Sequence, residues 1–403
     1  MRRGLLLLTG LVTAVLAGPL PVASARPATP TTVPPPTVDP SAPTPTSPWP
    51  GPPPTGSAPD GSTVGGAALR TRGVVVAKGA PALPAGVTAP GWLVADLGTG
   101  DVLAARDPHG RYYPASTLKT LTLLTLVHRL PTDGVVTATD DDERVEGTRV
   151  GLVTGGQYPV GLLFDALVLG SGNDVANALA RADGGTDTTV ARMNATARGL
   201  GAYDTVAGTA SGLDVAGQTS SPYDLALIFR ALLADPIAAG VLTTPKIQIP
   251  PEAGKPGFEV DNENPLLGGY AGDLGGKNGF TDAARHTFVT AAQRGGRRIV
   301  VTLMGVDRQP GVTEYDQAAH LLDWGFSVPA GTAGVGRLVT AADLAAAPAT
   351  ASATATTPPP RAPAPVGRHP VLGPVMASAA GAAALVVGSG LLRLRLRLRR
   401  RRR

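Results

Sequence analysis

Ser116 and Lys119 form a pair whose residue types and spacing could do chemistry. They lie three positions apart in residues 113–120, which read YPASTLKT. If a helix begins near Ser116, this spacing brings Lys119 to the same face, within reach of the serine hydroxyl. Apolar neighbours would desolvate the amine and lower its pKa, which makes a lysine usable as a general base. The pattern indicates a serine nucleophile with a lysine base, although a helix-capping serine beside a solvated lysine has the same pattern.

Two later groups of polar residues could complete such a site. Ser171 and Asn173, in the tripeptide Ser-Gly-Asn, offer a hydroxyl that relays a proton and an amide that both donates and accepts. Lys277 and Gly279 lie in residues 275–281, which read GGKNGFT, beside a predicted strand. A cationic lysine binds a carboxylate, and a glycine lets another group approach a strand closely. Each group is weak evidence alone, and their order along the chain strengthens the hypothesis of a hydrolytic site.

The composition excludes several other kinds of chemistry. The chain has no cysteine, which excludes disulfides and thiolate nucleophiles. Its five histidines show no HExxH or similar ligand spacing, so we expect no metal and no other cofactor. The formal net charge is +5, but residues 393–403 contain eight arginines. The basicity therefore belongs to the C-terminal tail, and the body needs no nucleic-acid partner.

The apolar pattern outlines the elements that must position these residues. Residues 91–105 read as two strands around a Gly-Thr-Gly-Asp turn. We expect helices over 118–130, over 162–182 with a break at 170–173, and over 189–200, 223–233 and 313–324, with further strands over 286–292 and 297–304. Strands at both ends with helices between them favour an α/β fold of the α+β type, in which helices cover an antiparallel sheet.

The two ends of the chain read as targeting segments and spacers. Residues 1–25 combine a basic start, an apolar run and a small-residue site, which predicts a cleaved signal peptide rather than a membrane helix. Residues 26–70 and 329–370 are rich in Pro, Thr and Ala, which predicts disordered linkers around a catalytic domain at 71–328.

Beyond the second linker, residues 371–392 are uncharged, mainly apolar and long enough for one transmembrane helix. The arginines of 393–403 predict a basic cytoplasmic tail, and a nucleic-acid or amphipathic tail is the alternative. The catalytic domain is then expected to be exported and anchored in the cell membrane by a C-terminal helix.

The ordered motifs S-x-x-K, S-x-N and K-x-G, in a chain with export signals, resemble those of penicillin-binding proteins and related serine enzymes. The chain is most similar to D-alanyl-D-alanine carboxypeptidases of the S11 peptidase type, in particular actinobacterial, membrane-anchored members. The likeness extends from about residue 91 to residue 326 and includes YYPASTLKTLTLL, LVLGSGNDVANALA, TASGLD and GGKNGFTDAARHTFV.

The resemblance implies a β-lactamase/DD-peptidase-like serine transpeptidase fold. It also implies removal of the terminal D-Ala from peptidoglycan stem peptides, with β-lactam antibiotics as covalent inhibitors. Ser116 matches the nucleophile that forms the acyl-enzyme, and Lys119 matches its general base. By the same likeness, Ser171 shuttles protons, Asn173 holds the substrate backbone, and Lys277 orders Ser171 and the substrate carboxylate.

The resemblance also implies a substrate-binding strand. Gly279 allows close approach, and the backbone N–H groups of Ser116 and Phe280 form the oxyanion hole, whose donors typically contribute about 10²–10³-fold each in rate. One position departs from the family, which usually has Thr where this chain has Asn278. An Asn amide can donate the same bond to the terminal carboxylate, but it is longer and planar. The departure therefore concerns carboxylate affinity more than acylation.

Two questions stay open in the sequence. Arg308 and Arg285 are both candidates for the family's additional carboxylate-binding arginine. Two rival functions also remain, a serine β-lactamase and a wall-associated module that binds penicillin without catalysis. Rapid penicillin turnover would favour the first, and a stable adduct without D-Ala release would favour the second. The sequence leaves the exact muropeptide, the balance between carboxypeptidase and endopeptidase action, and the oligomeric state open.

Overall fold

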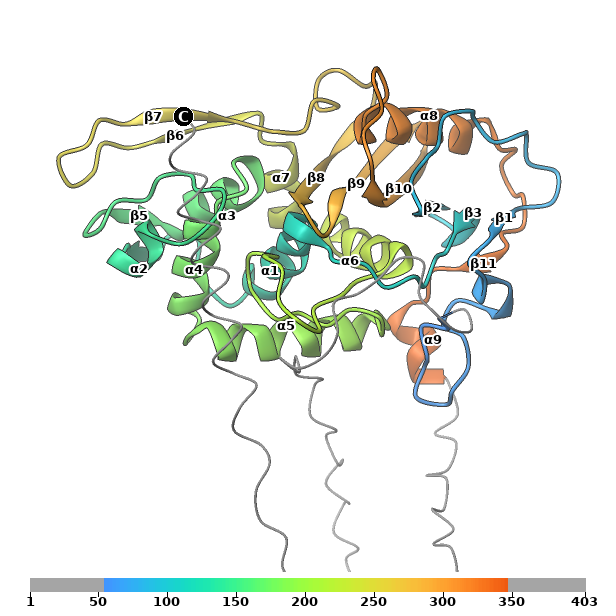
Figure 1. The fold of residues 1–403 in the computed structure, drawn as a ribbon, viewed down its shortest axis with the longest axis horizontal. Helices are drawn as coiled ribbons and strands as arrows, with labels where there is room; N and C mark the ends of the chain where they lie inside the picture. Colours follow the sequence, from blue (N-terminus) through green and yellow to red (C-terminus); the bar gives the residue numbers. More distant parts are fainter. Residues whose placement is uncertain (1–53, 347–403) are drawn as a thin grey trace, which may run out of the picture. The chain divides into compact units, whose positions relative to one another are not determined.

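The computed structural model describes residues 54–346. The expected signal peptide, most of the first linker, the transmembrane segment and the basic tail lie outside the described residues. Figure 1 shows the described residues as a mixed structure of helices and strands.

A seven-stranded antiparallel sheet lies at the centre of the described residues. Its strand order is β1-β3-β2-β10-β9-β8, and β11 pairs with β3. This order places β8 at one end of the path. The expected hairpin and the two later strands are confirmed. The strands are β1 (Val74–Val76), β2 (Gly91–Asp96), β3 (Asp101–Arg106), β8 (Asp273–Thr281), β9 (Arg285–Arg294), β10 (Arg297–Val306) and β11 (Gly336–Arg337).

Both faces of this sheet are buried. Leu93 of β2 packs into one hydrophobic cluster, and its neighbour Val94 packs into a second one with Leu321 and Leu322 of α8 (Glu314–Ser327). The first cluster includes residues of α1 (Lys119–Leu126), α3 (Val160–Leu169), α4 (Asn173–Ala182) and α6 (Pro222–Ala234). Successive side chains of a strand point to opposite faces, so helices cover the sheet on both sides. In Figure 1, α8 lies above the strands, and α1 and α6 lie below them. The predicted antiparallel sheet covered by helices is confirmed.

The larger helices follow the expected pattern, with shifted ends. The break at 170–173 separates α3 from α4, and Ser221 caps α6, in which Pro222 is the first residue. The helix expected over 118–130 is shorter, because it starts as a 3₁₀ turn, η2 (Ala115–Leu118), and ends at Leu126. The helices are α1 (Lys119–Leu126), α3 (Val160–Leu169), α4 (Asn173–Ala182), α5 (Thr186–Leu200), α6 (Pro222–Ala234) and α8 (Glu314–Ser327).

Several short elements were not predicted. Two small hairpins lie outside the main sheet, β4 (Val135–Thr137) with β5 (Gln157–Pro159), and β6 (Lys246–Ile249) with β7 (Phe258–Asp261). The helices α2 (Asp140–Glu143) and α7 (Pro236–Thr243) accompany them.

The folded body is longer at both ends than the expected boundaries of 71 and 328. The turn η1 (Ala67–Leu69), strand β11 and helix α9 (Ala341–Ala346) fall inside the segments expected to be linkers. Leu69 and Leu338 are fully buried, and the Tyr223 hydroxyl donates to the carbonyl of Arg337 at 2.7 Å. Isolated apolar residues in a Pro- and Ala-rich stretch gave too weak a periodic signal to predict this packing.

Within residues 54–346, no single helix is both long and apolar enough to cross a bilayer. Together α6 and α7 meet the length and composition limits, but their axes bend by 103° at the break between them.

Candidate active site

The Lys119 amine lies beside the Ser116 hydroxyl. Ser116 sits in η2 and Lys119 is the first residue of α1, with 3.0 Å between Nζ and Oγ. The same nitrogen donates to Asn173 Oδ1 and to the Ser211 carbonyl, each at 2.7 Å. A neutral amine has two N–H bonds and one lone pair. Two fixed acceptors occupy the two N–H bonds, which leaves the lone pair for the proton of Ser116.

The environment of Lys119 favours this neutral form. Its side chain is fully buried. Burial, followed by the nearby charge of Lys277, holds the pKa of Lys119 well below its ordinary value, while Glu263 and Asp174 act in the opposite direction. A desolvated amine with a lowered pKa can accept a proton near neutral pH, as a general base must.

The second motif lies at the start of α4. Ser171 lies two residues before the first residue of this helix, is 5% exposed and has a φ of 54°, an uncommon value for a residue with a side chain. Asn173 begins the helix, and its Nδ2 donates to the carbonyl of Glu146 at 2.8 Å. Asn173 is therefore fixed from both sides, by this carbonyl and by the amine of Lys119. The structure brings Asn173 into direct contact with the first motif.

The third motif lies inside β8, whereas the sequence predicted a strand only after it. Lys277 is 1% exposed, and its Nζ donates to Asn278 Oδ1 at 2.9 Å. Burial lowers the pKa of Lys277 to about 8, and Glu263 opposes this shift. Gly279 lies against the nucleophile, because a Cβ added there would be 2.7 Å from the backbone nitrogen of Ser116. Residue 279 therefore has no room for a side chain, and β8 runs directly beside Ser116.

The remaining predicted residues lie around this end of β8. Phe280 is half exposed, and its ring lies 4.5 Å from that of His286. Arg308 is held by two hydrogen bonds to the buried carboxylate of Glu314. Arg285 pairs with Asp307, and both line a cavity of about 470 Å³. Both candidate arginines are thus engaged by carboxylates of the chain itself.

Comparison with known proteins identifies the family. A family model described as D-alanyl-D-alanine carboxypeptidase matches residues 77–308. The D-alanyl-D-alanine carboxypeptidase DacB2 of Mycobacterium tuberculosis is 46% identical over 240 residues, which cover 59% of this chain and 82% of that protein. The chain belongs to the D-alanyl-D-alanine carboxypeptidase family. It is accordingly a serine-type peptidase, as the three motifs predicted.

Solved structures agree with this assignment. A crystal structure of a D-alanyl-D-alanine carboxypeptidase from Mycobacterium tuberculosis is 44% identical, with a TM-score of 0.62, and the match covers 65% of this chain and 99% of that one. A Streptomyces DD-transpeptidase is 24% identical, with a TM-score of 0.57, over 61% of this chain and all of that one. The similarity to the Streptomyces enzyme, at 24% identity, supports the fold and carries no argument about activity.

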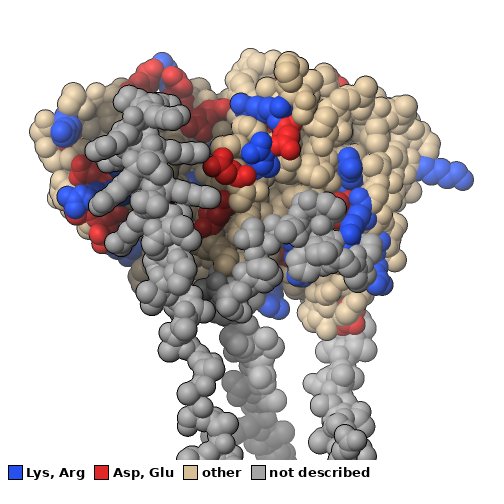
Figure 2. Space-filling view, in the orientation of Figure 1, with Lys and Arg blue, Asp and Glu red and all other residues tan. Residues whose placement is uncertain are grey.

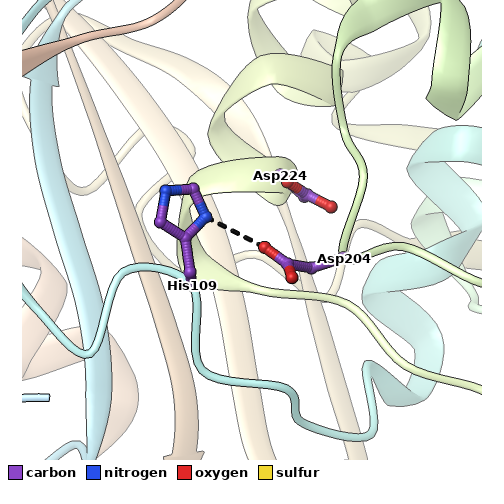
Figure 3. A group of neighbouring side chains, drawn as sticks. All are labelled: His109, Asp204 and Asp224. Carbon is purple, nitrogen blue, oxygen red and sulfur yellow. Dashed lines mark hydrogen bonds and ion pairs between the residues drawn. The ribbon is translucent and has the colours of Figure 1, made fainter. Parts of the chain in front are cut away.

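The structure also gathers a buried group that the histidine spacing did not reveal. His109, Asp204 and Asp224 place their ligand atoms within 4.8 Å of one another (Figure 3). His109 Nδ1 lies 2.9 Å from Asp204 Oδ2, and Nε2 lies 3.1 Å from the carbonyl of Val64. Both ring nitrogens therefore lie at hydrogen-bond distance from oxygens of the chain, Asp204 on one side and the Val64 carbonyl on the other. We assign the group to a hydrogen-bond network that joins residue 64 to the loop before the nucleophile.

Two features of the site were missed in the sequence. The carbonyl of Ser211 binds Lys119, and the next residue, Gly212, has a φ of 87°. A Cβ at Gly212 would lie 1.9 Å from the carbonyl oxygen of Ala115, so only glycine fits there. The stretch TASGLD contains both residues, but only its likeness to the family marked it as important.

Proposed function

We propose that this chain hydrolyses the terminal D-Ala–D-Ala bond of peptidoglycan stem peptides through an acyl-enzyme on Ser116. The observation that supports this most directly is the buried Lys119 amine, 3.0 Å from the Ser116 hydroxyl and with a lowered pKa. The names of the relatives support the substrate class.

The chemistry proceeds in two steps. In the first, Ser116 Oγ attacks the carbonyl carbon of the penultimate D-Ala while Lys119 takes the hydroxyl proton. The negative oxygen is stabilised by the backbone N–H groups of Ser116 and Phe280. The proton then passes, with the help of Ser171, to the amine of the departing D-Ala. In the second step, water attacks the ester, and its proton returns to Ser116 as the shortened peptide leaves.

The position of β8 supports this mode of binding. Because β8 ends the strand order of the sheet, an extended peptide can pair with its free side as an added strand. Lys277 and Asn278 then face the terminal carboxylate, while Gly279 leaves room for the scissile bond beside Ser116. A β-lactam, which is a cyclic amide with a carboxylate, would occupy the same groups and acylate the same serine.

The test is to incubate the protein with penicillin and to map the adduct by intact mass and peptide mass spectrometry. We expect one adduct, on Ser116, and release of D-Ala from a D-Ala-D-Ala peptide that the Ser116→Ala variant lacks. Equal D-Ala release by the variant would refute the proposal. Rapid turnover of penicillin in place of a persistent adduct would favour a β-lactamase.

We further propose that the enzyme is exported and anchored in the cell membrane, with its catalytic domain outside. The support is the pattern of the sequence, an apolar N-terminal run followed by a small-residue site, and 22 uncharged residues at 371–392 before the arginines. The linkers then separate the catalytic domain from the membrane.

A further inference from the structure

Asn278 lies between two charged groups that fix the orientation of its amide. Its Oδ1 accepts from Lys277 Nζ at 2.9 Å, and its Nδ2 donates to Glu263 Oε2 at 3.2 Å. Exchanging the two ends of the amide would put donor against donor and acceptor against acceptor. The amide therefore has one stable orientation, in which one of its two N–H donors points to Glu263, and the Asn278 side chain also hydrogen-bonds Tyr315.

The backbone around Glu263 is anchored although the side chain is exposed. Glu263 follows β7, and its N–H donates to the carbonyl of Leu169 at the end of α3. The next residue, Asn264, is buried and donates to Asp273 of β8 at 3.0 Å. Both contacts hold the Glu263 carboxylate beside the third motif.

The hairpin that precedes Glu263 carries further acidic side chains. Asp and Glu side chains are prominent on the left of Figure 2, where α2 and β6–β7 lie. Glu259 and Asp261 of β7 belong to this region, and Glu259 is paired with Lys246. The Glu263 side chain is exposed, so a substrate carboxylate that approaches Asn278 meets its charge.

Glu263 also interacts with the charged groups that face it. Its charge raises the pKa of both Lys277 and Lys119 against the larger effect of burial, and it raises the pKa of Tyr315. The Glu263 carboxylate therefore stands close to the groups that the terminal carboxylate of a substrate has to reach.

We propose that Glu263 is a specificity-determining residue, an internal carboxylate that competes with the terminal carboxylate of the substrate for the Asn278 amide. The proposal rests on the proposed function. Asn278 Nδ2 has two N–H donors, so the substrate carboxylate competes with Glu263 for the N–H that Glu263 occupies and is repelled by the Glu263 charge at the other. The site consequently discriminates less between a charged and an uncharged peptide terminus than it would without this glutamate.

The test compares wild type with Glu263→Gln and Glu263→Ala, and uses Glu259→Gln as the control for loss of one negative charge nearby. The kcat and KM for cleavage are measured for a D-Ala-D-Ala peptide and for the same peptide with its terminal carboxyl amidated. Because Glu263 also raises the pKa of Lys277, the kinetics are measured at about pH 6, where this lysine stays mostly charged with or without Glu263. At this pH we expect Glu263→Gln to lower KM for the free-acid peptide about two- to five-fold, the range typical of an exposed charge interaction, with kcat nearly unchanged. Glu263→Ala, which also removes the acceptor, should lower KM further.

Two further measurements distinguish competition by Glu263 from a structural effect of the substitutions. KM for the amidated peptide should not fall in either Glu263 variant, and the gain for the free acid should shrink at high salt because exposed charges are screened. The Glu259→Gln control should behave as wild type. An unchanged or raised KM for the free acid in Glu263→Gln, while wild type cleaves normally, would overturn the proposal and leave the proposed function intact.

If wild type releases no D-Ala, the proposed function is wrong. The proposal that Glu263 competes for Asn278 is then tested by the rate of acylation by penicillin. Penicillin carries a carboxylate of its own, so Glu263→Gln should accelerate acylation about two- to five-fold and Glu259→Gln should not. Equal acylation rates in wild type and Glu263→Gln would show that Glu263 does not compete with a ligand carboxylate for Asn278.

Discussion

Lys119 and Lys277 are both buried, yet the proposed mechanism requires different charges on them. Lys119 must be neutral to accept the proton of Ser116, whereas Lys277 must be cationic to bind a carboxylate. Burial together with the positive charge of Lys277 depresses the pKa of Lys119 well below its ordinary value. For Lys277 burial is opposed by Glu263, and its pKa is lowered only to about 8. The unequal surroundings thus support the proposal that Lys119 is the base and that Lys277 binds the substrate carboxylate.

This assignment predicts a loss of substrate affinity above pH 8. As the pH rises through the Lys277 pKa of about 8, the ammonium becomes neutral and attracts the terminal carboxylate less. We therefore expect kcat/KM for a D-Ala-D-Ala peptide to fall on the alkaline side, with a midpoint near 8, because kcat/KM reports the free enzyme. Steady-state kinetics between pH 6 and about 10 measure this directly.

The matched variant is Lys277→Arg, because a guanidinium stays charged throughout this range. The variant should be less active overall, since the guanidinium is larger and fits this buried position less well, but its kcat/KM should show no decline near pH 8. If kcat/KM declines at the same pH in both proteins, a group other than Lys277 causes the decline.

Local spacing predicted part of this site, and tertiary contacts supply the rest. The sequence placed Lys119 beside Ser116 because three residues return a helix to the same face, and the 3.0 Å separation confirms the contact. The partners Ser211 and Glu263 come from segments far away in the chain. A contact made by a backbone carbonyl cannot be recognised from the residue type, and nothing in the sequence distinguishes Glu263 from other exposed glutamates. The roles of all the predicted site residues in the reaction stay predictions.

At the level of elements, the turn η2 is positioned by a loop that packs against it without a side chain between them. Gly212 has a φ of 87°, and its α-carbon faces the carbonyl of Ala115, the residue before the nucleophile. Thr287 of β9 donates to the carbonyl of Pro114 at 2.9 Å from another side. The backbone that precedes Ser116 is thus held by two separate elements.

We predict that Gly212→Ala impairs acylation and stability together. The methyl group would meet the Ala115 carbonyl at 1.9 Å and force η2 to move. The expected loss of unfolding free energy is about 1–2 kcal/mol for the left-handed backbone and about 1–3 kcal/mol more for the crowding. Thermal or urea unfolding measures the stability, and the rate of penicillin acylation measures the displacement of Ser116.

The matched control is Gly155→Ala, because Gly155 has a φ of 82° and a Cβ there meets nothing within 4 Å. This variant should lose only the backbone contribution of about 1–2 kcal/mol and should acylate at the wild-type rate. Equal losses in the two variants would show that crowding against Ala115 is unimportant.

The sequence predicted long elements better than short ones. The helices α3, α4, α5, α6 and α8 and the strands of the central hairpins have enough apolar residues to show their period. The hairpins β4–β5 and β6–β7 have strands of three or four residues, which are too short for a pattern. The strand β8 was recognised only in part because its motif is Gly-rich, and glycine is normally depleted in strands.

At the scale of the whole molecule, the folded body contains more residues than the composition of the sequence predicted. Strand β11 extends the sheet beside β3, and the Arg230 guanidinium donates to the Leu338 carbonyl at 2.9 Å. Residues up to 346 therefore belong with the catalytic domain. The boundary matters for any shortened chain, because a cut at the expected position of 328 would remove β11 and the buried Leu338.

A chain that ends after residue 346 tests the membrane proposal at this scale. It keeps every described element and lacks the apolar segment 371–392 and the arginines. Expressed with its N-terminal segment in a bacterium, the full chain should fractionate with the membrane and be cleaved by protease added outside the cell. The shortened chain should appear in the medium or the soluble envelope fraction and release D-Ala with an unchanged kcat, because the site lies wholly within 54–346. Recovery of the full chain in the soluble fraction, or continued membrane association of the shortened one, would contradict anchoring by 371–392.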